Sequence, residues 1–200
     1  MPEDAFAVYV LAHGAGAGMD HPFMEAISAR LADRGVATLR YQFPYMEAGG
    51  RRPDPPPIAQ KTVRAAVDRA LEFGLPVFAG GRSFGGRMTA YAAVAALEEI
   101  FGLVFLGFPL HPSGRDGTER WGRLTELRRE TLILQGDRDR LANLDLLRPL
   151  VAALQPEGKL HIVEGGDHSF KVLKRSGRSE AEVLEELSRA ISDWAKRLMP

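Results

Sequence analysis

Short apolar runs alternate with longer amphipathic segments along the whole chain. The first apolar run, residues 5–12, is rich in β-forming residues and stops at Gly14, which is typical of a strand that is buried on both faces. Residues 22–34 then place a large apolar residue at every fourth position and end at Gly35, which is typical of a helix. Because the two patterns repeat, the sequence predicts an alternation of strands and helices.

The repeated pattern predicts six strands and six helices. The strands are expected at residues 5–12, 36–41, 76–79, 102–106, 131–135 and 159–163. The helices are expected at residues 22–34 and 59–73, in an Ala-rich segment that ends at Glu99, at residues 118–128 and 144–154, and after Ser179. This alternation favours an α/β fold, namely a three-layer α/β/α sandwich with a mainly parallel, doubly wound sheet of about six strands.

Two segments carry strong local signals. Ser179, with Glu182 three residues later, forms a capping box, and the apolar residues from Val183 to Leu198 then share one helix face. By contrast, residues 42–57 contain five prolines and two glycines among sixteen positions, which excludes a regular helix or a central strand. We therefore expect a long loop at residues 42–57.

Length and composition fit a single domain that spans residues 1–200. The 200 residues suffice for one large core, 45% of them are hydrophobic, and 26 basic residues balance 26 acidic ones. A balanced charge gives no general attraction to nucleic acids or to acidic membranes. We therefore expect no nucleic-acid partner and no membrane partner. The expected oligomeric state is a monomer or homodimer.

The chain contains no cysteine. This excludes disulfide bonds, a thiolate nucleophile and a Cys-based metal site, and it fits a reducing compartment. Apolar runs such as residues 5–12 are too short to cross a bilayer or to serve as a signal peptide. We therefore expect a cytoplasmic protein.

The candidate nucleophile is Ser83, which lies between a predicted strand and a predicted helix. Gly81, Ser83 and Gly85 form the pattern G-x-S-x-G. A serine at a sharp strand-to-helix turn has strained backbone angles and needs minimal side chains two residues away on either side. The turn lifts the hydroxyl above the positive N-terminus of the helix. A tight turn without catalytic chemistry is the alternative, but the position between strand and helix favours a nucleophile.

A serine hydroxyl needs a base to accept its proton and an acid to orient that base. Among the five histidines, His168 lies downstream of Ser83 in a loop directly after a strand, provided that His161 points from within that strand. Two acids, Asp137 and Asp139, follow the preceding strand. We favour Asp139 because Asp137 lies so close to the strand end that local backbone N–H groups are expected to hold it. The order nucleophile, acid, base is that of α/β-hydrolases.

The tetrahedral oxygen formed at such a serine needs two N–H donors. One is expected from Phe84, which follows the nucleophile. The other is expected from the loop after the first strand, where small residues let the backbone approach a substrate; we assign it to Ala15, with Gly14 as the alternative. The glycines of this loop match neither the dinucleotide-binding pattern nor the P-loop pattern, so nucleotide binding is not expected.

The loops around this edge of the sheet also supply candidate pocket residues. These are His13, Tyr45, Arg51, Arg82 and His111. An arginine here can bind a substrate carboxylate through paired hydrogen bonds. However, 21 of the 26 basic residues are arginine, so surface arginines in an Arg-biased chain explain the pattern equally well. Both interpretations stay open from the sequence.

Seven segments together resemble the dienelactone hydrolase-like branch of the α/β-hydrolase superfamily. They are AHGAGAGMDHP, RYQFPY, RRPD, GGRSFGGRM, GFPLHP, LILQGDRD and GGDHSF, and they cover nearly the whole chain. The chain looks most like the branch that contains testis-expressed protein 30 and the hydrolase-like region of a non-specific-lethal chromatin-complex subunit. The resemblance implies a minimal α/β-hydrolase fold and a triad of Ser83, Asp139 and His168, and it implies no particular substrate.

Large cap domains in this superfamily usually follow the strand after the nucleophile helix. Here residues 109–130 leave room for a loop and one short helix, so we expect no large cap and an open cleft for a small or extended acyl substrate. The leading hypothesis is a serine-dependent esterase, thioesterase or lactonase that needs no metal and no cofactor. The alternatives are a non-catalytic binding or scaffold protein of the same fold and a peptidase-type serine hydrolase.

Overall fold

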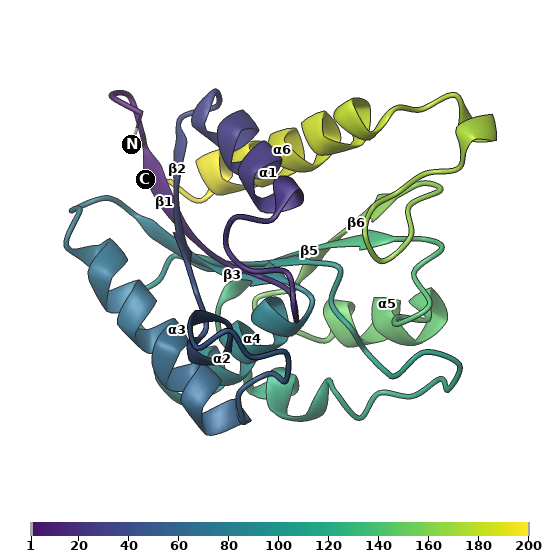
Figure 1. Ribbon diagram of the computed structural model, residues 1–200, viewed down its shortest axis with the longest axis horizontal. Coiled ribbons are helices and arrows are strands. Elements are labelled where there is room, and N and C mark those ends of the chain that lie inside the picture. The colour runs from purple at the N-terminus through teal and green to yellow at the C-terminus, as the bar shows by residue number, and fades with distance from the viewer. Residues whose placement is uncertain (1, 200) are drawn as a thin grey trace.

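The computed structural model describes residues 2–199, which form one parallel sheet with helices on both faces (Figure 1). The strands are β1 (Ala7–Ala12), β2 (Val36–Tyr41), β3 (Val77–Arg82), β4 (Gly102–Leu106), β5 (Glu130–Gly136) and β6 (Lys159–Val163). Their order in the sheet is β2-β1-β3-β4-β5-β6, and every neighbouring pair is parallel. The order reverses at β1 and β3, which is where parallel α/β sheets bind their ligands.

The helices form two layers, which confirms the predicted α/β/α sandwich. In Figure 1, α1 and the yellow α6 lie on one face of the sheet, and α3, α4 and α5 lie on the other. The helices are α1 (Pro22–Ala32), α2 (Pro44–Glu47), α3 (Pro56–Leu71), α4 (Phe84–Ala96), α5 (Leu144–Ala152) and α6 (Glu180–Arg197), with 3-10 turns η1 (Gly122–Glu126) and η2 (Lys174–Ser176).

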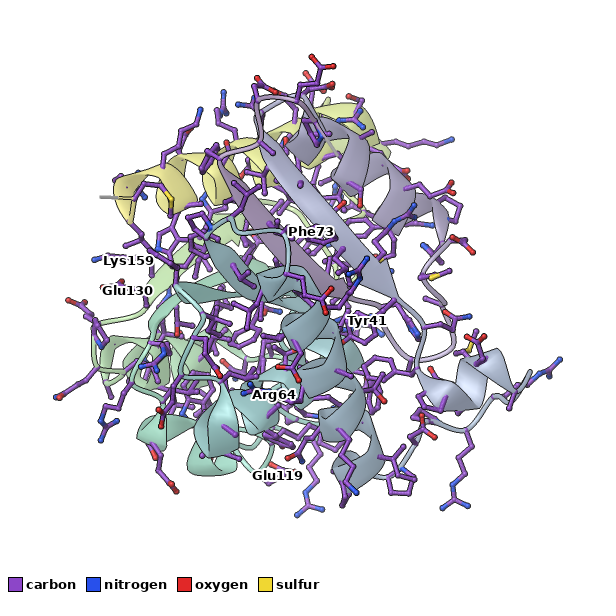
Figure 2. All side chains as sticks on the ribbon, turned by 90° about the vertical axis from the view of Figure 1, so that its left-hand side faces the viewer. Tyr41, Arg64, Phe73, Glu119, Glu130 and Lys159 are labelled. Carbon is purple, nitrogen blue, oxygen red and sulfur yellow. The ribbon has the colours of Figure 1, made fainter. Side chains whose placement is uncertain are left out.

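Strand β1 is buried on both faces, as its apolar run predicts. Val8 and Val10 belong to the core under α3, α4 and α5, whereas Tyr9 and Leu11 belong to the core under α1 and α6. The hydroxyl of Tyr9 donates a 2.9 Å hydrogen bond to the carbonyl of Val104, so its polar atom is satisfied inside the core. Side chains fill both layers between sheet and helices (Figure 2).

Strand β3 is longer than the sequence pattern predicts. The prediction ended the strand at Ala79, because Gly80 and Gly81 interrupt the apolar run, but the strand continues to Arg82. At Gly80 a Cβ atom would stand 1.8 Å from the carbonyl oxygen of Val104, so the neighbouring strand leaves no room for a side chain. The glycines therefore allow close strand pairing instead of ending the strand.

Two other predicted segments differ in detail. Residues 42–57 are not one continuous loop, because α2 forms within them and α3 already begins at Pro56. Both helices begin with proline, whose missing N–H has no helical partner at that position. The helix predicted at residues 118–128 is only the 3-10 turn η1.

The connection between β4 and β5 carries no large cap. Residues 107–129 contain only η1 as a helical element, and the rest of this segment is irregular. The edge of the sheet that holds the carboxyl ends of the strands is therefore not covered by an inserted domain. Within residues 2–199, no helix is both long enough and apolar enough to traverse a lipid bilayer.

Candidate active site

Ser83 lies at the tight turn between β3 and α4. Its φ and ψ angles are 50° and −113°, a left-handed conformation that non-glycine residues rarely adopt. A Cβ atom at Gly81 would stand 2.4 Å from the carbonyl oxygen of Ala12, and one at Gly85 would stand 2.5 Å from that of His13. The two glycines are thus required because β1 and its following loop pass directly against this turn.

Three side chains form a continuous hydrogen-bonded chain at this turn. The distance from Ser83 Oγ to His168 Nε2 is 2.8 Å, and the distance from His168 Nδ1 to Asp139 Oδ2 is 2.7 Å. The side chain of Asp139 is fully buried, so the carboxylate is shielded from water. With Nδ1–H donating to the carboxylate, Nε2 is free to accept the proton of the serine hydroxyl.

The carboxylate of Asp139 is held by further donors. The backbone N–H of Leu141 donates to Oδ1 at 2.8 Å, and the side-chain amide of Gln135 donates to Oδ2. The neighbouring Asp137 has a different role, because its Oδ1 accepts the backbone N–H of Gly165 at 2.8 Å. Asp137 therefore anchors the loop that carries His168; a backbone N–H group holds it, but this group comes from the loop after β6 and not from the expected local backbone.

Two backbone N–H groups lie beside Ser83 without a partner among the described residues. Phe84 is the first residue of α4, so its N–H has no partner within the helix. Ala15 comes from the loop after β1, and both residues line the same cavity as Ser83. A Cβ atom at Gly14 would stand 3.8 Å from Ser83 Cβ, which shows how closely this loop approaches the turn.

His13 holds the loop after β1 and does not line the cavity, contrary to the sequence-based interpretation. Its side chain is fully buried; Nδ1–H donates to the carbonyl of Gly14 at 2.8 Å, and Nε2 accepts the N–H of Phe43 at 3.2 Å. Burial lowers the pKa of His13, with a smaller opposing effect from the bond to Gly14. The ring is therefore neutral, and both of its nitrogens serve the backbone.

Tyr45 and His111 also prove to be supporting residues instead of cavity residues. Tyr45 is buried, and its hydroxyl accepts the N–H of Gly16 at 2.9 Å. His111 is 2% exposed; Nδ1–H donates to the carbonyl of Pro112 and Nε2 accepts the N–H of Asn143 at 2.8 Å. Local sequence cannot reveal the bonds to Gly16 and Asn143, because these partners come from other loops.

The two candidate arginines lie elsewhere. Arg51 is exposed and does not line the cavity beside Ser83. Arg82 points to the α1 side of the sheet, where its Nη2 donates to Ser169 Oγ at 2.8 Å and its guanidinium lies 4.9 Å from the ring centroid of Phe23. It lines a separate cavity of about 450 Å³ together with His21.

The cavity beside Ser83 contains residues that the sequence analysis did not single out. About 320 Å³ of open space is lined by Ala15, Pro53, Asp54, Pro56, Ser83, Phe84, Arg87, Pro109, Arg120 and Leu141. Arg87 follows Ser83 by one helical turn, so helical periodicity alone could have pointed to it. Arg120 comes from the irregular connection between β4 and β5, for which the sequence gives no comparable signal.

Comparisons with known proteins agree with this architecture. A family model described as an alpha/beta hydrolase domain matches residues 5–196. The dienelactone hydrolase of Anabaena variabilis is similar to the whole chain over 90% of its own length, with a TM-score of 0.75 and 20% identity. A lidless α/β serine hydrolase from Xanthomonas campestris (TM-score 0.72, 19% identity) and a monoacylglycerol lipase from Paleococcus ferrophilus (0.72, 17%) also match 100% of the chain, over 85% and 96% of their own lengths. At these identities the likeness concerns the fold.

Proposed function

The chain belongs to the alpha/beta hydrolase domain family, and on that basis we propose that it is a serine-dependent acyl hydrolase of the esterase, thioesterase or lactonase type. The observation that carries the proposal is the chain of hydrogen bonds from Ser83 through His168 to Asp139, at 2.8 and 2.7 Å. These distances lie within the reach needed for proton transfer between a nucleophile and its base.

In the first step Ser83 Oγ attacks the carbonyl carbon of the substrate. His168 Nε2 accepts the hydroxyl proton as the new bond forms, and the buried carboxylate of Asp139 stabilises the resulting imidazolium. The carbonyl oxygen becomes an oxyanion, which receives hydrogen bonds from the N–H groups of Phe84 and Ala15. The N-terminus of α4 adds positive potential at the same point.

In the second step the tetrahedral intermediate collapses. The leaving alcohol or thiol receives the proton from His168, and the acyl group stays on Ser83 as an ester. Water then attacks this ester, His168 again accepts a proton, and the acid is released as the serine hydroxyl is restored. The small cavity and the absence of a large cap between β4 and β5 favour a short or extended acyl substrate.

Active-site labelling tests the proposal directly. A fluorophosphonate probe is expected to label the wild-type protein at Ser83 and to fail with Ser83→Ala. Ser176→Ala, which removes an exposed hydroxyl on η2, serves as the matched control and should label normally. A wild-type protein that resists the probe and hydrolyses no short-chain p-nitrophenyl ester would argue against the proposal.

Labelling, combined with co-purification and turnover assays, separates the remaining functions. A non-catalytic scaffold of the same fold predicts no labelling together with a stable co-purified partner. A peptidase-type hydrolase predicts labelling together with cleavage of aminoacyl amides in preference to esters. The acyl hydrolase predicts labelling together with ester or thioester turnover.

A further inference from the structure

The cavity beside Ser83 holds two arginine side chains and one carboxylate. Arg87 comes from the first turn of α4, Arg120 from the connection between β4 and β5, and Asp54 from the segment before α3. The remaining lining is largely proline and other apolar side chains or the reacting residues themselves. The cavity thus has a positive wall next to the serine hydroxyl.

Arg87 is half-buried, and part of its guanidinium group lacks a partner. Its Nε is buried and has no hydrogen-bond partner in the part of the chain that the structure describes. Its closest described aromatic contact is loose, since Cζ lies 6.0 Å from the ring centroid of Tyr91. A buried N–H without an acceptor is costly, and such a group calls for an explanation such as a ligand.

Arg64 and Arg82 show how the chain itself can hold a guanidinium group. Arg64 of α3 bonds the carboxylates of Asp68 and Glu99. Arg82 also has a buried, unpartnered Nε, but its guanidinium donates to Ser169 and lies over an aromatic ring. Arg87 has only the distant ring of Tyr91 and no side-chain hydrogen bond to the described residues, and it is the one of these three that lines the cavity containing Ser83.

Hydrogen bonds hold the backbone of Arg120 and one nitrogen of its guanidinium group. Its Nη1 donates to the carbonyl of His111 at 3.0 Å, and its own carbonyl accepts the hydroxyl of Tyr91 at 2.9 Å. Burial, and then the charge of Arg87, lower the pKa of Arg120, while Glu119 opposes this effect. Both side chains also line the same cavity, so their like charges repel each other and an anion bound there would relieve that repulsion.

The nearby carboxylates do not cancel this positive charge. Oδ2 of Asp54 accepts the backbone N–H of Tyr45 at 3.1 Å, and the structure shows no ion pair from it to either arginine. Glu119 is exposed at the surface of the molecule, where Figure 2 labels it. Two cations therefore face the cavity with one acid in its lining.

We propose that Arg87 and Arg120 bind a carboxylate of the substrate, so that the preferred substrates are acyl esters or thioesters with an anionic group close to the scissile carbonyl. This inference rests on the proposed function, because the anion is placed relative to Ser83. Arg87 follows the nucleophile by four residues, about 6 Å along the helix axis. The charged group therefore lies only a few carbon atoms from the carbonyl. Planar guanidinium groups suit carboxylate oxygens through paired hydrogen bonds.

Matched pairs of esters test the inference. The mono-p-nitrophenyl esters of glutarate and adipate carry a carboxylate on the acyl chain, and their methyl esters are the neutral partners. For an anionic leaving group, 4-acetoxybenzoate is compared with its methyl ester. The measured quantity is the ratio of kcat/KM for the anionic and neutral member of each pair, determined for wild type and for variants so that intrinsic ester reactivity cancels.

Four variants distinguish the arginines from charge in general. Arg87→Gln and Arg120→Gln are each expected to lower the anionic-to-neutral ratio by about tenfold, the size expected for a lost charged hydrogen bond. Arg87→Lys keeps the positive charge but loses the planar guanidinium group that forms paired hydrogen bonds, so it should retain part of the preference for anionic esters. Arg148→Gln makes the same charge change at an exposed site on α5 and should leave the ratio unaltered.

Binding of free glutarate gives a readout that does not depend on turnover. Calorimetry should detect glutarate binding to wild type and to Ser83→Ala, and lose it in the double variant Arg87→Gln/Arg120→Gln with unchanged circular dichroism. If Ser83 is labelled and neutral esters react without any anionic preference, the inference fails while the proposed function stands. A wild-type protein that binds no glutarate and shows no preference overturns the inference, whatever the outcome of labelling.

Discussion

Nη2 of Arg82 donates a 2.8 Å hydrogen bond to Oγ of Ser169. This bond joins the residue before Ser83 to the residue after His168, so it links the backbone of the proposed nucleophile to the loop of the proposed base. The guanidinium also lies over the ring of Phe23 in α1. The link therefore acts on the opposite side of the sheet from the cavity that contains Ser83.

Loss of this link should slow the reaction more than it weakens substrate binding. For Arg82→Met we expect kcat to fall by about tenfold to a hundredfold with little change in KM, because a small displacement of His168 spoils proton transfer. Ser169→Ala should show a milder effect in the same direction. Arg82→Lys should restore part of kcat, and steady-state kinetics with a short-chain p-nitrophenyl ester provides the measurement. Equal losses in Arg82→Lys and Arg82→Met would contradict a positioning role for the charge.

The two aspartates after β5 should behave differently. Asp139→Asn removes the carboxylate that contacts His168 and is expected to lower kcat by about 10³- to 10⁴-fold, since the imidazolium loses its partner and the tautomer changes. Asp137→Asn removes only a charge, since the amide oxygen can still accept the N–H of Gly165, and it leaves the contact between Asp139 and His168 intact, so its effect on kcat should stay within tenfold. Single-turnover acylation rates measure both. A larger loss in Asp137→Asn would mean that the acid is wrongly assigned.

The sequence predicts the proposed catalytic residues as candidates because each of them follows a strand. Ser83 comes directly after β3, Asp139 and His168 lie in the loops that follow β5 and β6, and parallel strands bring their carboxyl ends to one edge. The capping box of Ser179 and Glu182 is likewise a local signal, and the structure contains it. Patterns of this kind depend on neighbouring residues only.

Local sequence patterns do not predict the contacts that support the site. His13 is held by Phe43, and His111 is held by Asn143, so the role of each ring depends on a loop that lies about 30 positions away in the chain. Arg120 reaches the cavity from an irregular segment whose path follows from packing and not from periodicity. Sequence alone therefore points to the proposed catalytic residues more readily than to the wall of the cavity.

The glycine two residues after Ser83 should tolerate no side chain. In Gly85→Ala the new Cβ atom would meet the carbonyl oxygen of His13 at 2.5 Å, and both groups belong to the packed backbone. We expect a destabilisation of about 3 kcal/mol or more, or an insoluble product. Gly74→Ala is the matched control, because its positive φ of 69° costs only about 1–2 kcal/mol and nothing lies within 4 Å. Urea denaturation measures the difference, and similar losses in both variants would refute the steric argument.

His13 should make the protein less stable as the pH falls. Burial lowers its pKa in the folded state below the ordinary value near 6.5, so the unfolded chain binds the proton more tightly. Stability from the neutral ring is therefore present above pH 6.5 and is lost as the pH drops below that value, by at most about 1.4 kcal/mol per pH unit. Protonation would also place an N–H opposite the N–H of Phe43, which needs an acceptor.

A variant isolates the contribution of this ring from those of other titrating groups. His13→Gln keeps a side chain that can both donate and accept but does not titrate, so its unfolding free energy should depend less on pH between 7 and 5 than that of wild type. His21 also has a lowered pKa, caused first by burial and then by the charges of Arg82 and Lys171, but it caps α1 at the surface. His21→Asn is therefore the control for a less buried ring. Between pH 7 and 5, the pH dependence of its unfolding free energy should differ from that of wild type by less than the pH dependence of His13→Gln does. If the unfolding free energies of wild type and His13→Gln changed in parallel with pH, protonation of His13 would not be what destabilises the protein. The assignment of a neutral His13 ring would then lose its support.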